Sequence, residues 1–72
     1  MIQKRSVVIA GHATSVSLEQ EFWQALRQIA RRRGQSLAGI VASADRDRAG
    51  NLSSALRLLV LESYRTGEIG RG

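Results

Sequence analysis

The hydrophobic pattern of this chain changes its period within a few residues, with no loop between the two patterns. From Thr14 to Leu18, apolar or β-branched residues alternate with small polar ones, as in a strand with one buried face. From Phe22 to Ala30, apolar residues recur every three or four positions, as on one face of a helix. The sequence therefore predicts a ribbon strand over 13–18 that runs directly into a helix.

Such a strand needs a partner, because its backbone hydrogen-bonding groups and its apolar face are otherwise exposed. Two partners are available. One is the upstream β-branched run 6–10, followed by a plausible turn at Gly11-His12; the other is the same strand of a second copy. Residues 1–12 are accordingly expected to form either a basic arm or an extra strand, and both alternatives stay open.

The length of 72 residues permits one domain, spanning 1–72. A chain of this size buries only about 60% of its unfolded surface, so it needs additional stabilisation. The sequence has no cysteine and one histidine, His12, so no disulfide, metal or other cofactor is expected. Oligomerisation is the remaining means of stabilisation.

The charge balance favours a polyanionic partner. Eleven Lys and Arg residues against six Asp and Glu give a net charge of +5, which favours nucleic acid. No segment approaches the roughly 20 apolar residues of a membrane span, and no nucleophile, base and orienting group can be assembled. The sequence predicts a cytoplasmic, nucleoid-associated protein that is not an enzyme.

Three helices are expected, over 19–33, 36–45 and 51–65. Ser17 and Gln20 have capping-box spacing, three arginines occupy the last turn of the first helix, and Gly34 follows as a left-handed cap. Ser36 can cap the second helix, and Asn51 or Ser53 the third. The polar segment 45–50 between them is expected to be a solvated loop.

The third helix is apolar on more than one face, because Leu58 and Leu61 lie outside its main apolar stripe. Such a helix must be covered on more than one side, which favours a dimer. Trp23 can either cover the dimer interface or stack on a base. Burial is expected for it and for Tyr64, because large apolar side chains dominate interfaces. The glycine-rich segment 66–72 is expected to be a frayed tail.

The strand, the helix, Gly34-Gln35-Ser36 and the apolar pair Ile40-Val41 together resemble the ribbon-helix-helix family of DNA-binding repressors, the CopG, Arc and methionine-repressor group. Residues 4–12, 15–19, 22–23 and 51–57 are similar to a bacterial subgroup of uncharacterised ribbon-helix-helix proteins. The resemblance implies a mostly α fold with a short β-ribbon and an additional C-terminal helix. It also implies a homodimer, able to assemble further, whose two chains pair their strands and insert the ribbon into the major groove of double-stranded DNA.

Carried over by position, the resemblance implies a base-reading face made of Ala13, Ser15 and Ser17. It also implies that backbone N–H groups hold a phosphate at the turn formed by Gln35, Ser36 and Leu37. Alanine and serine discriminate bases poorly. Either the preceding segment supplies the missing donors, or binding is mostly electrostatic; the candidates are Lys4, Arg5, Ser6 and His12.

Two further alternatives stay open. The segment 51–57 is itself similar to the start of the family's second helix, so the phosphate-holding turn is either 34–36, which we prefer for its distance from the strand, or 50–53. The leading functional hypothesis is a transcriptional repressor. The alternative is a protein-interaction module, antitoxin-like, that binds a partner protein through the C-terminal helix.

Overall fold

The computed structural model describes residues 1–47 and 50–70 of the chain. Its elements are β1 (Ile2–Ile9), β2 (His12–Glu19), α1 (Gln20–Arg33), α2 (Leu37–Asp47) and α3 (Leu52–Arg65). The expected class is confirmed: the fold is mostly α, with a short β-ribbon and an additional C-terminal helix.

The two strands form an antiparallel hairpin within one chain, paired from Ile9–His12 at the turn to Ile2–Glu19 at the open end. Ala10 and Gly11 have φ angles of 51° and 83°, as two-residue hairpin turns require. The upstream segment is therefore an extra strand, which begins at Ile2 rather than Ser6. The strand expected over 13–18 is longer by one residue at each end.

The hairpin has one buried and one exposed face. Val7, Val16 and Leu18 point inward and are buried. The intervening side chains point to solvent, because successive residues of a strand alternate between its faces. The predicted core face of β2 is confirmed at Val16 and Leu18, while Thr14 on the same face is only partly buried.

Trp23 joins the hairpin to the helices. Its side chain is fully buried, and its indole N–H donates to the backbone carbonyl of Gln3 at 3.0 Å. The Arg5 guanidinium lies 5.6 Å from the centre of its ring, within the range of a cation–π contact. The expected burial is confirmed, and it occurs within the chain's own core.

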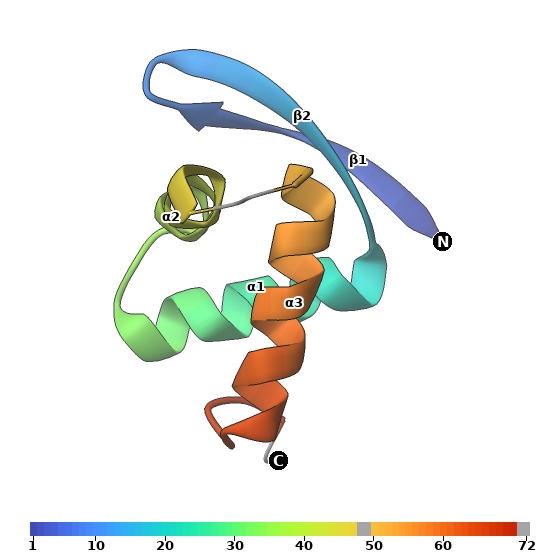
Figure 1. Ribbon diagram of the computed structural model, residues 1–72, viewed down its shortest axis with the longest axis vertical. Helices are drawn as coiled ribbons and strands as arrows, with labels where there is room; N and C mark the ends of the chain where they lie inside the picture. The colour runs from blue at the N-terminus through green and yellow to red at the C-terminus, as the bar shows by residue number, and fades with distance from the viewer. Residues whose placement is uncertain (48–49, 71–72) are drawn as a thin grey trace.

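The helices stack on the inner face of the hairpin (Figure 1). The hairpin lies at one end of the molecule with α2 beneath it, while α3 runs toward the opposite end and crosses α1. Leu26, Ile29, Val41 and Leu56 are among the fully buried residues of the shared core. Phe22 is only partly buried at the edge of this core.

The two ends of α1 differ in how well the sequence predicted them. Gly34 caps the C-terminus with φ 66°, as expected. The capping box is wrong: Glu19 occupies the N-cap position without a side-chain cap hydrogen bond. Ser17 lies inside β2 and cannot cap the helix, since the strand passes directly into α1.

The other caps follow the sequence. The Ser36 hydroxyl accepts from the Gly39 N–H at 3.0 Å, and the Asn51 side chain accepts from the Ser54 N–H at 2.8 Å. Helix α2 continues to Asp47, so the first part of the expected 45–50 loop is helical. The middle of that loop, residues 48–49, lies outside the described residues.

Residues 66–70 fold back onto the helices, so the expected frayed tail is wrong for this part of it. Ile69 is buried, and the Glu68 N–H donates to the Ser63 carbonyl at 2.9 Å. Gly70, with φ 89°, lies against the Tyr64 ring. Tyr64 itself stays half exposed in the single chain, so its burial stays a prediction.

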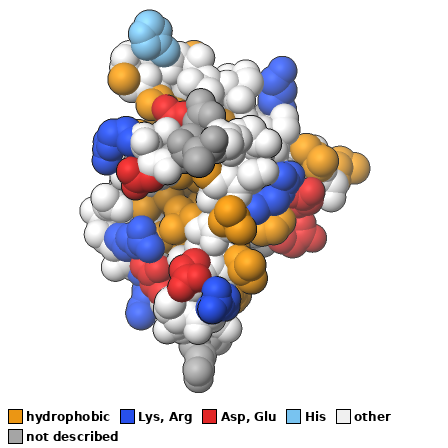
Figure 2. Space-filling model, in the orientation of Figure 1, with side chains coloured by type: hydrophobic (Ala, Val, Ile, Leu, Met, Phe, Trp, Pro, Cys, Tyr) orange, Lys and Arg blue, Asp and Glu red, His pale blue; other side chains and the backbone are white. Residues whose placement is uncertain are grey.

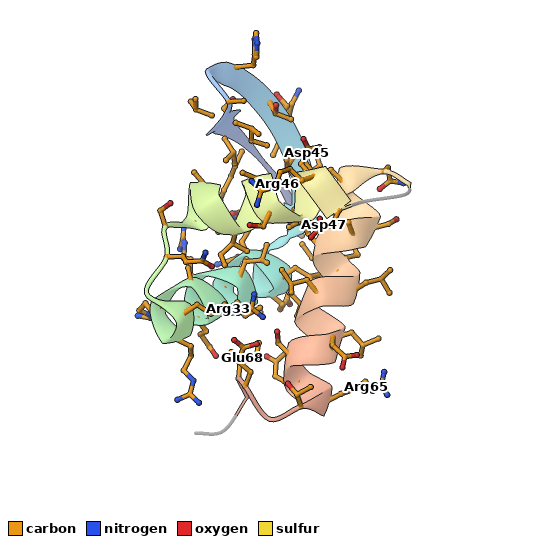
Figure 3. The ribbon with its side chains drawn as sticks, turned by 60° about the vertical axis from the view of Figure 1, so that its left-hand side comes forward. Arg33, Asp45, Arg46, Asp47, Arg65 and Glu68 are labelled. Carbon is orange, nitrogen blue, oxygen red and sulfur yellow. The ribbon has the colours of Figure 1, made fainter. Side chains whose placement is uncertain are left out.

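An ion pair holds this C-terminal segment. The Arg33 Nε donates to the Glu68 carboxylate at 2.6 Å and Nη2 at 2.9 Å, and the Ser63 hydroxyl donates to it at 3.0 Å. Figure 3 shows Arg33 and Glu68 side by side. The hydrogen bonds from Arg33 are the main cause that lowers the pKa of Glu68 from 4.5 to about 2.

Glu68→Gln is expected to make the protein less sensitive to acid. Because the pKa of Glu68 is depressed in the folded state, its stabilisation is present above pH 4.5 and is lost as the pH falls toward about 2. Urea midpoints at pH 6 and pH 3 should therefore differ less in Glu68→Gln than in the wild type. Glu62→Gln, at an exposed pair with Arg65, is the control and should retain the wild-type difference.

Candidate nucleic-acid interface

The outward face of the hairpin carries polar side chains from both strands, flanked by the exposed apolar side chains of Ile2 and Val8. Lys4 lies opposite Ser17, and Ser6 lies opposite Ser15; all four side chains are exposed. Ala13 extends the strip toward the turn, opposite Val8. We call Lys4, Ser6, Ala13, Ser15 and Ser17 the outer strip.

The outer strip has a net charge of +1, from Lys4, and contains no acidic residue. The nearest acid along the strand is Glu19, whose carboxylate lies 3.1 Å from the Arg57 guanidinium. A backbone hydrogen bond at Glu19 itself and then the bond from Arg57 lower the pKa of this carboxyl. Glu19 is thus ionised and paired with α3, which limits its repulsion of an approaching polyanion.

Arg5 lies on the opposite face from Lys4 and Ser6. Its guanidinium Nη2 donates to the side-chain oxygen of Gln3 at 3.2 Å, above the Trp23 ring. The structure therefore separates Arg5 from Lys4 and Ser6 and places it, partly buried, on the inner face of the hairpin beside Trp23.

His12 lies next to the turn of the hairpin and is exposed. Figure 2 shows the histidine at the tip of the molecule. The His12 side chain therefore lies at the turn end of the hairpin and not beside the middle of the outer strip.

Gln35 and Ser36 lie apart from the outer strip, where α1 passes into α2. The Gln35 N–H donates to the Ala30 carbonyl at 2.9 Å. The Ser36 hydroxyl accepts from the Gly39 N–H and so caps α2. Together with Arg27 and Arg31, Gln35 borders a shallow depression of about 600 Å³. No hairpin residue lines this depression.

The N-terminus of α3 adjoins the outer strip instead. The Ser53 hydroxyl donates to the backbone carbonyl of Ser17 at 3.2 Å, and Asn51 caps the helix. The first N–H groups of a helix lack intrahelical partners and attract anions. The structure thus brings the second candidate turn, 50–53, which the sequence left open as an alternative, next to the strip.

The structure also bears on two other kinds of site. Within residues 1–47 and 50–70, no group of three or more His, Asp or Glu side chains is placed to hold a metal ion. In the same part of the chain, no helix is long and apolar enough to cross a membrane.

Comparison with models of protein families shows which family this chain belongs to. The model of the ribbon-helix-helix domain matches residues 2–64, which include both strands and nearly all of the three helices. The chain belongs to the ribbon-helix-helix family. Its members are generally DNA-binding transcription regulators that act as dimers and are typically not enzymes.

A solved structure supports the assignment. This ribbon-helix-helix protein is similar to an uncharacterized protein from Bordetella pertussis Tohama I, with 35% sequence identity and a TM-score of 0.74. The likeness covers 96% of this chain and 62% of that chain, so this chain spans less than two thirds of the other protein. A search of curated proteins finds no match.

Proposed function

We propose that this protein is a homodimeric, sequence-specific repressor that binds double-stranded DNA by inserting its hairpin into the major groove. The observation that carries the proposal is the outer strip: a self-paired two-stranded ribbon that exposes Lys4 and three serines on one face and is mounted on the core through Trp23. A two-stranded ribbon fits the width of the major groove.

Within this proposal, the hydroxyls of Ser6, Ser15 and Ser17 contact base edges, and Lys4 contacts either a guanine edge or a phosphate. Of the four candidate donors in residues 4–12, Lys4 and Ser6 are exposed on the same face of the hairpin as Ser15 and Ser17, which supports this assignment. Ala13 adds apolar contact to a thymine methyl group.

Phosphate contacts flank the ribbon. The N-terminus of α3 lies beside Ser17 and is our preferred phosphate-holding turn, in place of Gln35 and Ser36. His12 reaches along the groove from the tip of the hairpin. The remaining positive charge supplies a sequence-independent attraction, and a dimer bound at a promoter blocks polymerase by occupancy. The protein would act in the cytoplasm, on the nucleoid.

The proposal predicts that Ser15→Ala with Ser17→Ala lowers sequence discrimination without unfolding the protein, since both hydroxyls are exposed. Binding would be compared between labelled duplexes: the DNA upstream of the protein's own gene and a scrambled version, at several salt concentrations. The affinity ratio should fall by about tenfold, the effect of one or two lost base contacts. Ser43→Ala, in α2, is the control and should keep the ratio.

Equal binding of the wild type to both duplexes would contradict a sequence-specific repressor. The second candidate function, binding of a partner protein through α3, is favoured by the exposure of Leu58 and Leu61, which are 64% and 55% exposed.

A further inference from the structure

The outward row of β2 continues beyond the outer strip to Glu19, where the strand passes into α1. Ser15, Ser17 and Glu19 are alternate residues of one strand, so they belong to the same face. The open end of the hairpin is closed at this point, because the Gln20 N–H donates to the Met1 carbonyl at 3.2 Å. A carboxylate therefore lies at the end of the surface that we propose to meet DNA.

Helix α3 reaches this row at two places. The Ser53 hydroxyl donates to the backbone carbonyl of Ser17 at 3.2 Å. One turn further along the helix, the Arg57 Nε donates to the Glu19 carboxylate at 3.2 Å. Residues four apart lie on the same side of a helix, so Ser53 and Arg57 face β2 together. Figure 1 shows the first turns of α3 next to this strand.

The pair of Arg57 and Glu19 does not use the full capacity of the guanidinium. Nε and Nη2 lie 3.2 and 3.1 Å from the same carboxylate oxygen, Oε1, whereas the strongest arginine pairs place two parallel N–H bonds on two oxygens. The two side chains are 36% and 37% exposed, and an ion pair in such a position adds little to stability. Arg57 can therefore exchange this partner for another anion at small cost.

The Phe22 ring holds Arg57 independently of Glu19. The guanidinium carbon lies 5.8 Å from the centre of the ring, within the range of a cation–π contact. A side chain that is already ordered by its neighbours loses less conformational freedom when it binds a ligand. Phosphate oxygens match the planar guanidinium as well as carboxylate oxygens do, so Arg57 is prepared for either anion.

Arg57 is also close to the preferred phosphate-holding turn. Four residues separate it from Ser53, which corresponds to about 6 Å along the helix axis. A duplex whose backbone lies against the first turn of α3 therefore brings a phosphate toward Arg57 and, with it, toward the Glu19 carboxylate. The two anions then compete for one cation.

We propose that Arg57 is a phosphate contact for which Glu19 competes. On binding, the guanidinium leaves the Glu19 carboxylate for a phosphate of the DNA backbone, and Glu19 thereby limits the affinity for DNA of any sequence. The inference rests on the proposed function, since it needs a duplex against the outer strip. It concerns phosphates alone, so it is tested on the scrambled duplex. Loss of the preference for the upstream duplex would contradict the repressor and leave this test in force.

Glu19→Gln is the first test, because glutamine keeps the size of the side chain and removes its charge. Binding to the scrambled duplex should tighten by about two- to fivefold per chain, the worth of a partly exposed ion pair that no longer has to be broken. The slope of log affinity against log salt should steepen by up to about 0.9 per chain, the contribution of one phosphate contact. Arg57→Ala should weaken the same binding, and circular dichroism checks that both variants are folded.

Glu21→Gln is the matched control. Glu21 is an exposed acid in the first turn of α1, so this variant removes the same charge from the same end of the molecule. Its effects on affinity and slope should be smaller than those of Glu19→Gln. Equal effects would overturn the proposal, since total charge would then explain both. Weaker binding by Glu19→Gln would also overturn it, because the ion pair would then serve only to hold α3 against the hairpin.

The side-chain resonances of arginine follow the exchange directly. In the wild type, the Arg57 Nε–H signal should shift when the scrambled duplex is added at low salt. The Arg65 signal should not, since Arg65 lies on the same helix in an exposed pair with Glu62. An unchanged Arg57 signal with shifted amides in the outer strip would overturn the proposal, as would the absence of any binding to this duplex.

Discussion

Trp23→Ala is expected to lower the free energy of unfolding by about 3–5 kcal/mol, the usual cost of truncating a buried large aromatic side chain. Trp23 is fully buried and is the contact through which α1 holds the hairpin by a hydrogen bond to Gln3. Since small domains have total stabilities of about 5–15 kcal/mol, the variant should lose a large fraction of its stability and unfold at a much lower urea concentration than the wild type. Urea denaturation followed by circular dichroism measures the loss.

Trp23→Phe separates the two contributions of this side chain. Phenylalanine keeps most of the apolar volume but removes the indole N–H, which leaves the Gln3 carbonyl without this donor. A smaller loss of about 1–3 kcal/mol is expected, the usual cost of one unsatisfied buried group. If Trp23→Ala proved as stable as Trp23→Phe, the tryptophan would not anchor the hairpin.

Lys4→Ala is expected to weaken binding to every duplex and to reduce the salt dependence of binding. Lys4 is exposed on the outer strip, opposite Ser17. Each phosphate contact contributes about 0.9 to the slope of log affinity against log salt; in a homodimer, the variant loses one such contact per chain. Titration of a labelled duplex at several salt concentrations measures this slope.

Arg5→Ala is the matched control at the adjacent position. Arg5 carries the same charge but points inward, toward Gln3 and Trp23. Its removal should lower the stability of the hairpin while leaving the salt slope close to that of the wild type. Equal changes in slope for Lys4→Ala and Arg5→Ala would contradict the assignment of the outer strip, because they would show that binding depends on charge alone.

The parts of the fold that the sequence predicted depend on local signals. The change of period between Thr14 and Phe22 placed the strand and the first helix, and the left-handed cap at Gly34 and the cap at Asn51 were read from neighbouring residues alone. Local hydrogen bonding and side-chain alternation determine these features, so a single sequence is sufficient.

The features that sequence reasoning missed depend on contacts between distant residues. The sequence alone left open whether β2 pairs with β1 or with the same strand of a second chain. Because the direction of the side chains in β1 depends on this pairing, the sequence also left open which of Lys4 and Arg5 faces outward. The fold-back of 66–70 depends on Arg33, which is 35 residues away from Glu68 along the chain. The proximity of the 50–53 turn to Ser17 likewise depends on how α3 crosses the helix layer.

Amide chemical-shift mapping of the labelled protein with its upstream duplex tests the central claim most directly. The account predicts that the largest shifts fall on Lys4, Ser6, Ser15 and Ser17, with further shifts at the N-terminus of α3. Shifts concentrated instead on Arg27 and Arg31 of α1, with the hairpin unchanged, would contradict it and would move the DNA-binding surface to the other side of the molecule.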